Sequence, residues 1–334
     1  MLDVPYVRLR FRHTPRLVYR TCMLSHPDTL CESIMADQVI ITGACGFVGA
    51  HLAVALARLG LKVIATDIQP LSGPTAAMFA TAGISSFVQG DLNDTDFVDS
   101  LLRHGGGVIH AAGSSRQSIV KANPPEAVNA TVGTTTLLLG MMRQYHTDWF
   151  ILLSSRDVER FNGMGKHAYS LDDVYALLKQ TAEDISHCYC MDSGIPLLIY
   201  RLSDVYGSAL DHPGKVLPIF IRRAREGLPL HVYEPTALCY FTHIHDVVAA
   251  ICEGVTELNK GRTSFDLRRA WNLPGITILK LAQLIKNILG NNTQLIINNS
   301  THDHVSILNN KYIPQGNNFI QKITLEDGLR KLLI

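Results

Sequence analysis

The middle of the chain alternates short apolar, mostly β-branched runs with longer amphipathic stretches. Short apolar runs bounded by turn residues predict buried strands, and apolar residues at helical spacing predict helices. We expect strands at residues 38–42, 62–66, 86–89, 107–110, 149–153 and 196–200. We expect helices at residues 47–59, 74–82, 94–103, 126–145 and 172–192.

This alternation indicates the fold class. Strands that alternate with helices form right-handed crossover units, in which a parallel sheet is covered by helices on both faces. We therefore predict an α/β protein whose residues 36–203 form a doubly wound parallel sheet of the Rossmann type. Such a sheet binds ligands at the carboxyl ends of its strands.

The rhythm changes after about residue 203. Short strands and Pro/Gly turns there separate three expected helices, at residues 216–226, 246–258 and 278–289. We interpret residues 204–334 as a smaller C-terminal substrate lobe that is partly interleaved with the last elements of the sheet.

The composition of the chain limits the classes of partner that it could bind. Lys and Arg number 30 against 29 Asp and Glu, so the charge balance does not favour nucleic acid or an anionic membrane as partner. The chain contains no run of about 18 uncharged apolar residues, and we predict no transmembrane helix. The seven cysteines are scattered and form no CxxC pair, which is typical of reduced thiols in a cytoplasmic protein.

The first residues have a different composition. Residues 1–34 carry five arginines and few acidic residues, and they lack the apolar core of a secretory signal. An organelle transit peptide is one interpretation. We favour the other, an N-terminal extension over residues 1–35 that lies outside the fold, because Met35 just precedes the first clear strand.

The strongest local motif is the segment TGACGFVG at residues 42–49, which has GxxGxxG spacing and lies between an expected strand and an expected helix. Glycine permits the tight turn and lets backbone N–H groups approach a pyrophosphate at the helix N-terminus. The motif predicts a dinucleotide site. Its cofactor-binding residues would be Gly43, Cys45, Gly46, Phe47, Val48 and Gly49.

An acidic residue follows the second strand, where it can select the dinucleotide. The Asp67 carboxylate could accept hydrogen bonds from ribose hydroxyls, and it would repel the 2′-phosphate of NADP. We therefore predict NAD as cofactor, with a turn-capping Asp67 as the alternative. After the third strand, Asp91 and Leu92 could meet the adenine, although Asp91 could equally cap the next helix.

Tyr175 and Lys179 have YxxxK spacing, which places both on one face of an expected helix. Ser154 and Ser155 stand at the end of the fifth strand. A phenol is a poor base at neutral pH, but a nearby lysine cation and a nicotinamide charge would lower its pKa. Ser155 would then hold a substrate oxygen while Tyr175 takes or returns its proton.

These motifs resemble, in their order, the extended short-chain dehydrogenase/reductases of the NAD-dependent epimerase/dehydratase family, of the UDP-galactose 4-epimerase type. The resemblance covers about residues 37–332. Further segments that carry it are HAAG at residues 110–113, RLSDVYG at residues 201–207 and FTHIHDV at residues 241–247.

The resemblance implies roles for individual residues. Ser155, Tyr175 and Lys179 would be catalytic, with Tyr175 and Lys179 also contacting the cofactor. Ala111, Ala112 and Gly113 would line the cofactor site. The substrate-binding residues would be Ser114, Arg116, Ser155, Asp204, Lys215 and Cys239.

The family's activity is implied in the same way. The chain would transfer a hydride transiently at a carbinol carbon of a nucleotide-activated sugar, with NAD as cofactor. The long helices at residues 126–145 and 172–192 would pair two copies into a homodimer, and residues such as Leu137, Leu138, Leu139, Met141 and Met142 supply apolar surface for it.

The chain departs from the family pattern at several positions. Arg156-Asp157 replaces the acidic pair of the sugar 4,6-dehydratases, which argues against dehydration. Cys239 replaces an arginine that grips a diphosphate, and Asp204 replaces an asparagine. Glu159-Arg160 replaces Tyr-Gly, and Asn129 lies one residue out of register with a cofactor-contacting asparagine.

Other interpretations remain open. Lys215, Arg222 or Arg223 could replace the missing diphosphate contact, or the substrate could be a carbonyl compound without a nucleotide. A non-catalytic NAD-binding protein is disfavoured because Ser, Tyr and Lys occur together. His243, His245 and Asp246 are spaced like metal ligands, but further ligands with suitable spacing are missing, and we predict no metal.

Overall fold

The computed structural model describes residues 37–145, 147–161, 169–271, 274–290, 293–298 and 319–333. The extension predicted at residues 1–35 lies outside this range. No helix in the described part of the chain is long and apolar enough to cross a membrane.

A parallel sheet of seven strands in the order β11-β6-β5-β4-β1-β2-β3 forms the centre of the structure. Its strands are β1 (Gln38–Thr42), β2 (Lys62–Asp67), β3 (Phe87–Gln89), β4 (Gly106–His110), β5 (Thr147–Ser155), β6 (Leu197–Leu202) and β11 (Phe265–Ala270). The predicted parallel sheet is confirmed. The strand β11, which comes from the C-terminal half of the chain, was not predicted.

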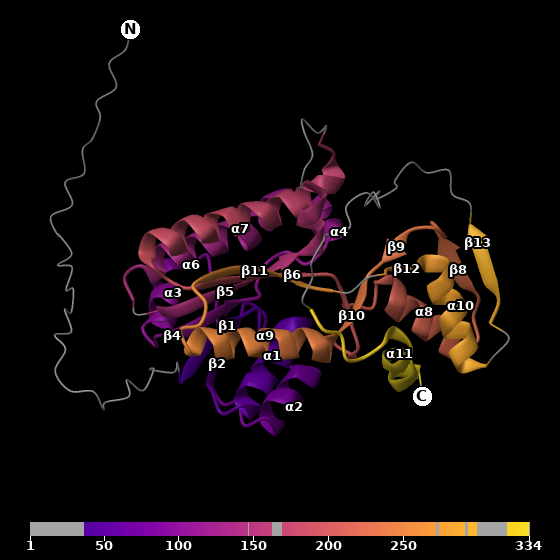
Figure 1. Cartoon of the computed structure of the whole chain (residues 1–334), viewed down its shortest axis with the longest axis horizontal. Helices are drawn as coiled ribbons and strands as arrows, with labels where there is room; N and C mark the ends of the chain where they lie inside the picture. Colours follow the sequence, from indigo (N-terminus) through magenta and orange to yellow (C-terminus); the bar gives the residue numbers. More distant parts are fainter. Residues whose placement is uncertain are drawn as a thin grey trace, which may run out of the picture. The chain divides into compact units, whose positions relative to one another are not determined.

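Helices cover both faces of this sheet, as the alternation predicts (Figure 1). On one face lie α1 (Phe47–Arg58) and α9 (Ile244–Asn259). On the other lie α3 (Thr95–Leu102), α6 (Thr134–Met142) and α7 (Val174–Ser193). Val39 and Ile41 face the first group and Ile40 the second, because successive side chains of a strand point to opposite faces.

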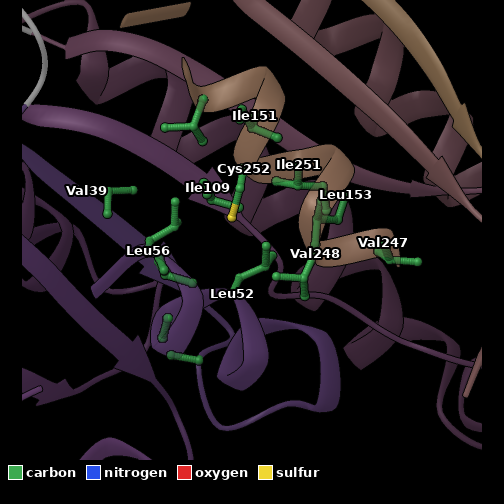
Figure 2. Close-up of a cluster of buried hydrophobic side chains, with 14 of the residues drawn as sticks. Val39, Leu52, Leu56, Ile109, Ile151, Leu153, Val247, Val248, Ile251 and Cys252 are labelled. Carbon is green, nitrogen blue, oxygen red and sulfur yellow. The ribbon is translucent and has the colours of Figure 1, made fainter. Parts of the chain in front are cut away.

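The core beneath α1 and α9 joins parts of the chain that are far apart in sequence. In Figure 2, Val248 of α9 lies next to Leu52 of α1, and Ile251 of α9 lies near Ile151 and Leu153 of β5, all within one buried cluster. Burying one such side chain stabilises the fold by about 1.5–3 kcal/mol. The helix expected at residues 246–258 therefore belongs to the cover of the sheet.

The helix expected at residues 126–145 differs in detail. It is made of α5 (Pro124–Val128), a π turn η1 (Asn129–Gly133) and α6. Two more helices are α2 (Gly73–Thr81), which was predicted, and α4 (Gln117–Ala122), which was not. The helix α7 follows two short 3₁₀ segments, η2 (Arg156–Phe161) and η3 (Leu171–Asp173).

The rest of the C-terminal part has a hydrophobic cluster of its own. It contains the helices α8 (Val216–Arg225), α10 (Ile278–Leu289) and α11 (Leu325–Leu333). Its short strand pairs are β8 (Leu230–Tyr233) with β13 (Leu295–Asn298), and β9 (Leu238–Cys239) with β12 (Ile276–Thr277). A further parallel pair is β7 (Asp204–Tyr206) with β10 (Phe241–His243), and β10 directly precedes α9 in the chain. The helix α11 was not predicted.

Candidate active site

The glycine loop lies between β1 and α1, at the carboxyl end of the sheet. Gly43 has φ +67°, and a Cβ built on it would lie 2.6 Å from the backbone nitrogen of Ala112. A Cβ on Gly49 would lie 2.2 Å from the carbonyl oxygen of Gly43. The helix α1 starts after Gly46 without a side-chain cap from any described residue. Its first N–H groups are therefore available to an anion.

Asp67, at the end of β2, faces this loop. Its Oδ2 accepts a hydrogen bond from the backbone N–H of Cys45 (2.8 Å), and its Oδ1 accepts one from that of Gln69 (2.9 Å). The carboxylate therefore holds the loop in shape and also lines the adjoining cavity. Asp91 accepts hydrogen bonds from Asn93, while the helix α3 is capped by Asp94.

A cavity of about 760 Å³ follows the carboxyl ends of β1, β2, β4 and β5. Most predicted cofactor-binding residues line it: Gly43, Gly46, Phe47, Val48, Gly49, Asp67, Asp91, Leu92, Ala111, Ala112, Gly113, Tyr175 and Lys179. Ser114, predicted to bind substrate, lines the same cavity. Among the described residues of the loop, Cys45 does not line it; its N–H supports Asp67 instead.

The predicted catalytic residues come together where β5 ends and α7 begins. The Tyr175 hydroxyl is hydrogen-bonded to that of Ser155. The Lys179 ammonium donates to the carbonyl oxygen of Leu153 at 3.2 Å. All three side chains line the 760 Å³ cavity, and Ser155 and Tyr175 also line a second cavity.

Burial shapes the titration of this trio. Desolvation raises the pKa of Tyr175, and the negative charge of Asp157 raises it further, while the hydrogen bond with Ser155 opposes both. Burial lowers the pKa of Lys179 to about 8, against the opposing charge of Glu183. The lowering of the Tyr175 pKa expected from the lysine together with a nicotinamide charge stays a prediction for the complex with the cofactor.

The buried histidine His110 lies close enough to Lys179 for the charge of the lysine to act on its ring. The His110 ring lies between two threonine hydroxyls, with Thr42 Oγ1 2.8 Å from Nδ1 and Thr135 Oγ1 3.0 Å from Nε2. Desolvation, helped by the charge of Lys179, lowers its pKa to about 3. The neutral ring therefore connects β1, β4 and α6. Sequence reasoning missed this connection, since the three residues are far apart in the chain.

The second cavity measures about 300 Å³ and adjoins the first. Four predicted substrate-binding residues line it: Arg116, Ser155, Asp204 and Lys215. Cys239 lines neither of the two cavities among the described residues. Arg156 and Asp157 do line the smaller cavity, although their sequence positions were read only as a departure from the family.

The cations near the smaller cavity differ in their partners. Lys215 forms an ion pair with Asp211 (2.8 Å), and Arg116 Nη1 lies 2.7 Å from Nδ1 of His212. Arg222 and Arg223, expected as possible replacements for the family's arginine, do not line either described cavity. Arg223, in the last turn of α8, instead donates to the carbonyl oxygen of Pro229 at 2.6 Å.

The departure at Glu159 has a structural explanation. The buried Glu159 carboxylate accepts hydrogen bonds from Arg201 (2.7 Å) and Arg269 (2.8 Å). Arg201 also donates to Glu183 (2.6 Å), which in turn accepts from Ser154. This network connects η2, α7, β6 and β11 next to the end of β5, which carries Ser154 and Ser155.

The one-residue offset at Asn129 coincides with the π turn η1. A π turn contains one more residue than an α-helical turn, so the helix on either side of it differs in register. Ala130, and not Asn129, lines the larger cavity. The hydroxyl of Thr131, the next residue, accepts a hydrogen bond from the backbone N–H of Ser114 at 3.1 Å.

Within the described ranges, no group of three His, Cys, Asp or Glu side chains could hold a metal ion. His243 instead caps α9 by accepting a hydrogen bond from the N–H of His245. Asp246, in the first turn of this helix, accepts one from the N–H of Ile323 at 3.0 Å.

Comparison with solved structures supports the fold. A UDP-glucose 4-epimerase from Thermotoga maritima superposes with a TM-score of 0.75 at 18% identity, covering 88% of this chain and 96% of that one. A UDP-glucuronic acid 4-epimerase from Bacillus cereus has a TM-score of 0.69 at 22% identity, covering 88% and 96%.

Sequence comparison identifies the family. A dTDP-glucose 4,6-dehydratase of Actinoplanes sp. is 28% identical over 218 residues, which is 59% of this chain and 65% of the relative. UDP-glucuronate 4-epimerase 4 of Arabidopsis thaliana is 28% identical over 69% of this chain and 56% of its own length. The matches thus span less than two thirds of these relatives. The profile of the NAD dependent epimerase/dehydratase family matches residues 39–267, and the chain belongs to that family.

Proposed function

We propose that this chain is an NAD-dependent enzyme that acts on a nucleotide-activated sugar by transient hydride transfer at a carbinol carbon. One observation carries the proposal. Ser155 and Tyr175 line both cavities, so a group held in the smaller cavity can meet a cofactor held in the larger one. The curated relatives with the family's sugar-nucleotide activities agree with this assignment.

The larger cavity suits a dinucleotide. Gly43 and Gly49 leave no room for a Cβ, α1 offers uncapped N–H groups, and Asp67 provides a carboxylate beside them. The loop would hold the pyrophosphate and Asp67 a ribose, with Lys179 toward the nicotinamide end. NAD, when bound, supplies the hydride acceptor and donor.

The residues of the trio divide the proton chemistry. The Ser155 hydroxyl would hold the substrate oxygen, and Tyr175 would exchange a proton with it. Because its pKa is raised, Tyr175 is protonated and suited to returning a proton to a carbonyl oxygen. Taking a proton from a carbinol requires added positive charge, to which the buried Lys179 ammonium contributes.

The outcome of the reaction is best described as epimerisation or dehydrogenation. Arg156 stands where the dehydratases resembled by this chain have an acid, so we disfavour dehydration. The test is to incubate the full chain and NAD with UDP-glucose, UDP-galactose, UDP-glucuronate and dTDP-glucose, and to follow the sugars by NMR. Conversion of none of them above the level of Tyr175→Phe would contradict the proposal.

A second candidate is an NAD-dependent dehydrogenase or reductase of a carbonyl compound without a nucleotide. Cys239 favours it, because a thiol cannot reproduce a bidentate arginine contact with a diphosphate. Binding of UDP, dTDP, GDP and CDP separates the two. If none has a Kd below about 1 mM, which corresponds to ~4 kcal/mol, the second candidate leads.

The homodimer and the cytoplasmic location stay predictions. The apolar residues put forward for the dimer interface are largely used within the chain, since Leu138, Leu139 and Met142 are buried in its own core. Light scattering decides the assembly, where a homodimer has twice the 36.8 kDa mass of the chain.

A further inference from the structure

Arg156 is a largely covered cation that lines the smaller cavity. Its side chain is 13% exposed, and its Nε has no hydrogen-bond partner among the described residues. The carboxylate nearest to it is that of Asp157, with Nη2 and Oδ1 4.0 Å apart. That separation is beyond a hydrogen bond.

Other arginines with little exposed surface have a carboxylate within hydrogen-bond distance. Arg201, with 8% of its side chain exposed, contacts two carboxylates at 2.6 and 2.7 Å. Arg160, with 14% exposed, contacts Asp173 at 2.9 Å, although its Nε, like that of Arg156, has no partner among the described residues. Removing a guanidinium from water costs free energy unless hydrogen bonds replace the lost hydration. Arg156 therefore keeps unused donor capacity in a site that is open to a ligand.

The acids around the cavity are in part engaged elsewhere. Asp211 pairs with Lys215 at 2.8 Å, and Asp204 accepts a hydrogen bond from the backbone N–H of Tyr240 at 2.9 Å. Asp157 remains, but its Oδ1 lies 4.0 Å from Arg156 Nη2, too far for a hydrogen bond, and burial raises the pKa of its carboxyl. Arg156 can therefore bind an anion that comes from outside the chain.

The position of Arg156 in the fold is held by an aromatic ring. Its guanidinium carbon lies 4.4 Å from the centroid of the Tyr240 ring, a distance suited to a cation–π contact. Tyr240 directly follows Cys239. Burial raises the pKa of the Cys239 thiol, and the charge of Arg156 opposes that rise. The arginine thus comes from the end of β5 and reaches the neighbourhood of β9, where the chain has Cys239.

We propose that Arg156 binds an oxyanion of the substrate in the smaller cavity, and so supplies the anion contact that Cys239 cannot make. This rests on the proposed function as far as the substrate is a nucleotide sugar. Two groups of such a substrate share the required chemistry: the diphosphate, and a carboxylate on the sugar. Both offer two oxygens to a planar guanidinium.

The experiment measures, by calorimetry at saturating NAD, the Kd of UDP, UDP-glucose and UDP-glucuronate for the wild-type chain and for Arg156→Gln and Arg156→Lys. We expect Arg156→Gln to raise the Kd about 10- to 100-fold, as for loss of a charge-assisted hydrogen bond, and Arg156→Lys to recover part of it. An equal loss for all three ligands assigns the contact to the diphosphate. A loss confined to UDP-glucuronate assigns it to the sugar carboxylate.

Controls separate binding from folding. Arg222→Gln removes the same charge from an exposed position outside both cavities, and its affinities should stay within about twofold of wild type. Arg156 does not line the larger cavity, so Arg156→Gln should keep the wild-type Kd for NAD if it is folded. Arg156→Lys keeps the charge and tests the contact if the Gln variant does not fold.

The proposal is overturned if both Arg156 variants bind every ligand within about twofold of wild type. If the wild-type chain binds none of the nucleotides, the proposed function fails, and inorganic pyrophosphate then tests the anion site alone. Pyrophosphate binding that depends on Arg156 supports the anion site. Pyrophosphate binding independent of Arg156, or absent in the wild type, overturns it.

Discussion

Burial acts on Tyr175 and Asp157 in the same direction. Desolvation is the main cause of the raised pKa of each, and the charge of Asp157 adds to it at Tyr175. The positive charges of Arg156 and Arg160 oppose the rise at Asp157. A negative charge on Asp157 therefore disfavours the phenolate of Tyr175.

Replacing Tyr175 by Phe tests the phenol directly. The variant lacks the hydroxyl bonded to Ser155 but retains the ring that fills the cavity wall. We expect turnover to fall at least ~100-fold, because proton transfer by a positioned side chain contributes about that much. The Kd for NAD, measured by calorimetry, should be nearly unchanged. Turnover within threefold of wild type, which is roughly 0.7 kcal/mol, would remove Tyr175 from the mechanism.

The buried ammonium of Lys179 should destabilise the folded protein at neutral pH, although the proposed reaction requires it. Its pKa in the folded protein is lowered from 10.5 to about 8, so the folded chain loses this proton before the unfolded chain does. Stability of the wild type should therefore rise as pH increases from about 8 to 10.5, by roughly 3 kcal/mol from this group.

The variant Lys179→Met has no ammonium at this position, so the part of the pH-dependent gain in stability that Lys179 contributes should be absent. The variant should melt at a higher temperature than wild type at pH 7. It should also lose turnover. Thermal melts of both proteins at a series of pH values check this. A Met variant less stable than wild type at pH 7 would show that the ammonium is stabilised in the fold.

At the scale of elements, the ends of parallel strands bring the site together. The loops after β1, β2 and β4 form the larger cavity, and the end of β5 carries Ser155, the proposed catalytic serine. Behind them, Arg201 of β6 links Glu183 of α7 with Glu159 of η2. Removing one partner of such a buried network typically costs about 3–5 kcal/mol, so it holds the β5 end and α7 in fixed relation.

The end of β2 should select the dinucleotide. We expect NAD to bind at least about tenfold more tightly than NADP, because the Asp67 carboxylate repels a 2′-phosphate. The conservative Asp67→Asn keeps an acceptor for the Cys45 N–H and removes the charge, so it should narrow this ratio. Calorimetry with both cofactors measures it. Equal or tighter binding of NADP by the wild type would contradict the assignment.

At the scale of the whole molecule, residues beyond 203 complete the sheet. The strand β11 pairs with β6, and Val247 and Ile251 of α9 are fully buried against the sheet and α1. The lobe at residues 204–334 was expected to interleave partly with the sheet, and β11 and α9 are the segments of it that share the core of residues 36–203.

A chain that ends at Ser203 should not fold cooperatively, because it exposes the edge of β6 and the apolar face that α9 covers. Circular dichroism during heating, with the full chain as reference, checks this. A cooperative transition together with NAD binding by the fragment would show that residues 36–203 form an independent domain.

Local patterns were sufficient for much of the fold. The apolar run of β1, the glycines after it and the YxxxK spacing of α7 are each contained in one short segment, so their interpretation needed no distant residue. The strand β11 was missed because its sequence FDLRRA carries three charged residues. Arg269 of this strand forms an ion pair with the Glu159 carboxylate, and the sequence of the strand does not reveal that contact.

The sequence by itself determined the class of fold and the place of the glycine loop, and it singled out the residues proposed as the catalytic trio, because helical spacing, strand runs and glycine turns act between near neighbours. The tertiary structure decided the direction of the Tyr175 pKa, the partners of Glu159 and the place of Arg156 beside the smaller cavity. Those properties depend on burial and on charges brought close from distant segments. Neither is set until the strands have paired and the helices have covered them.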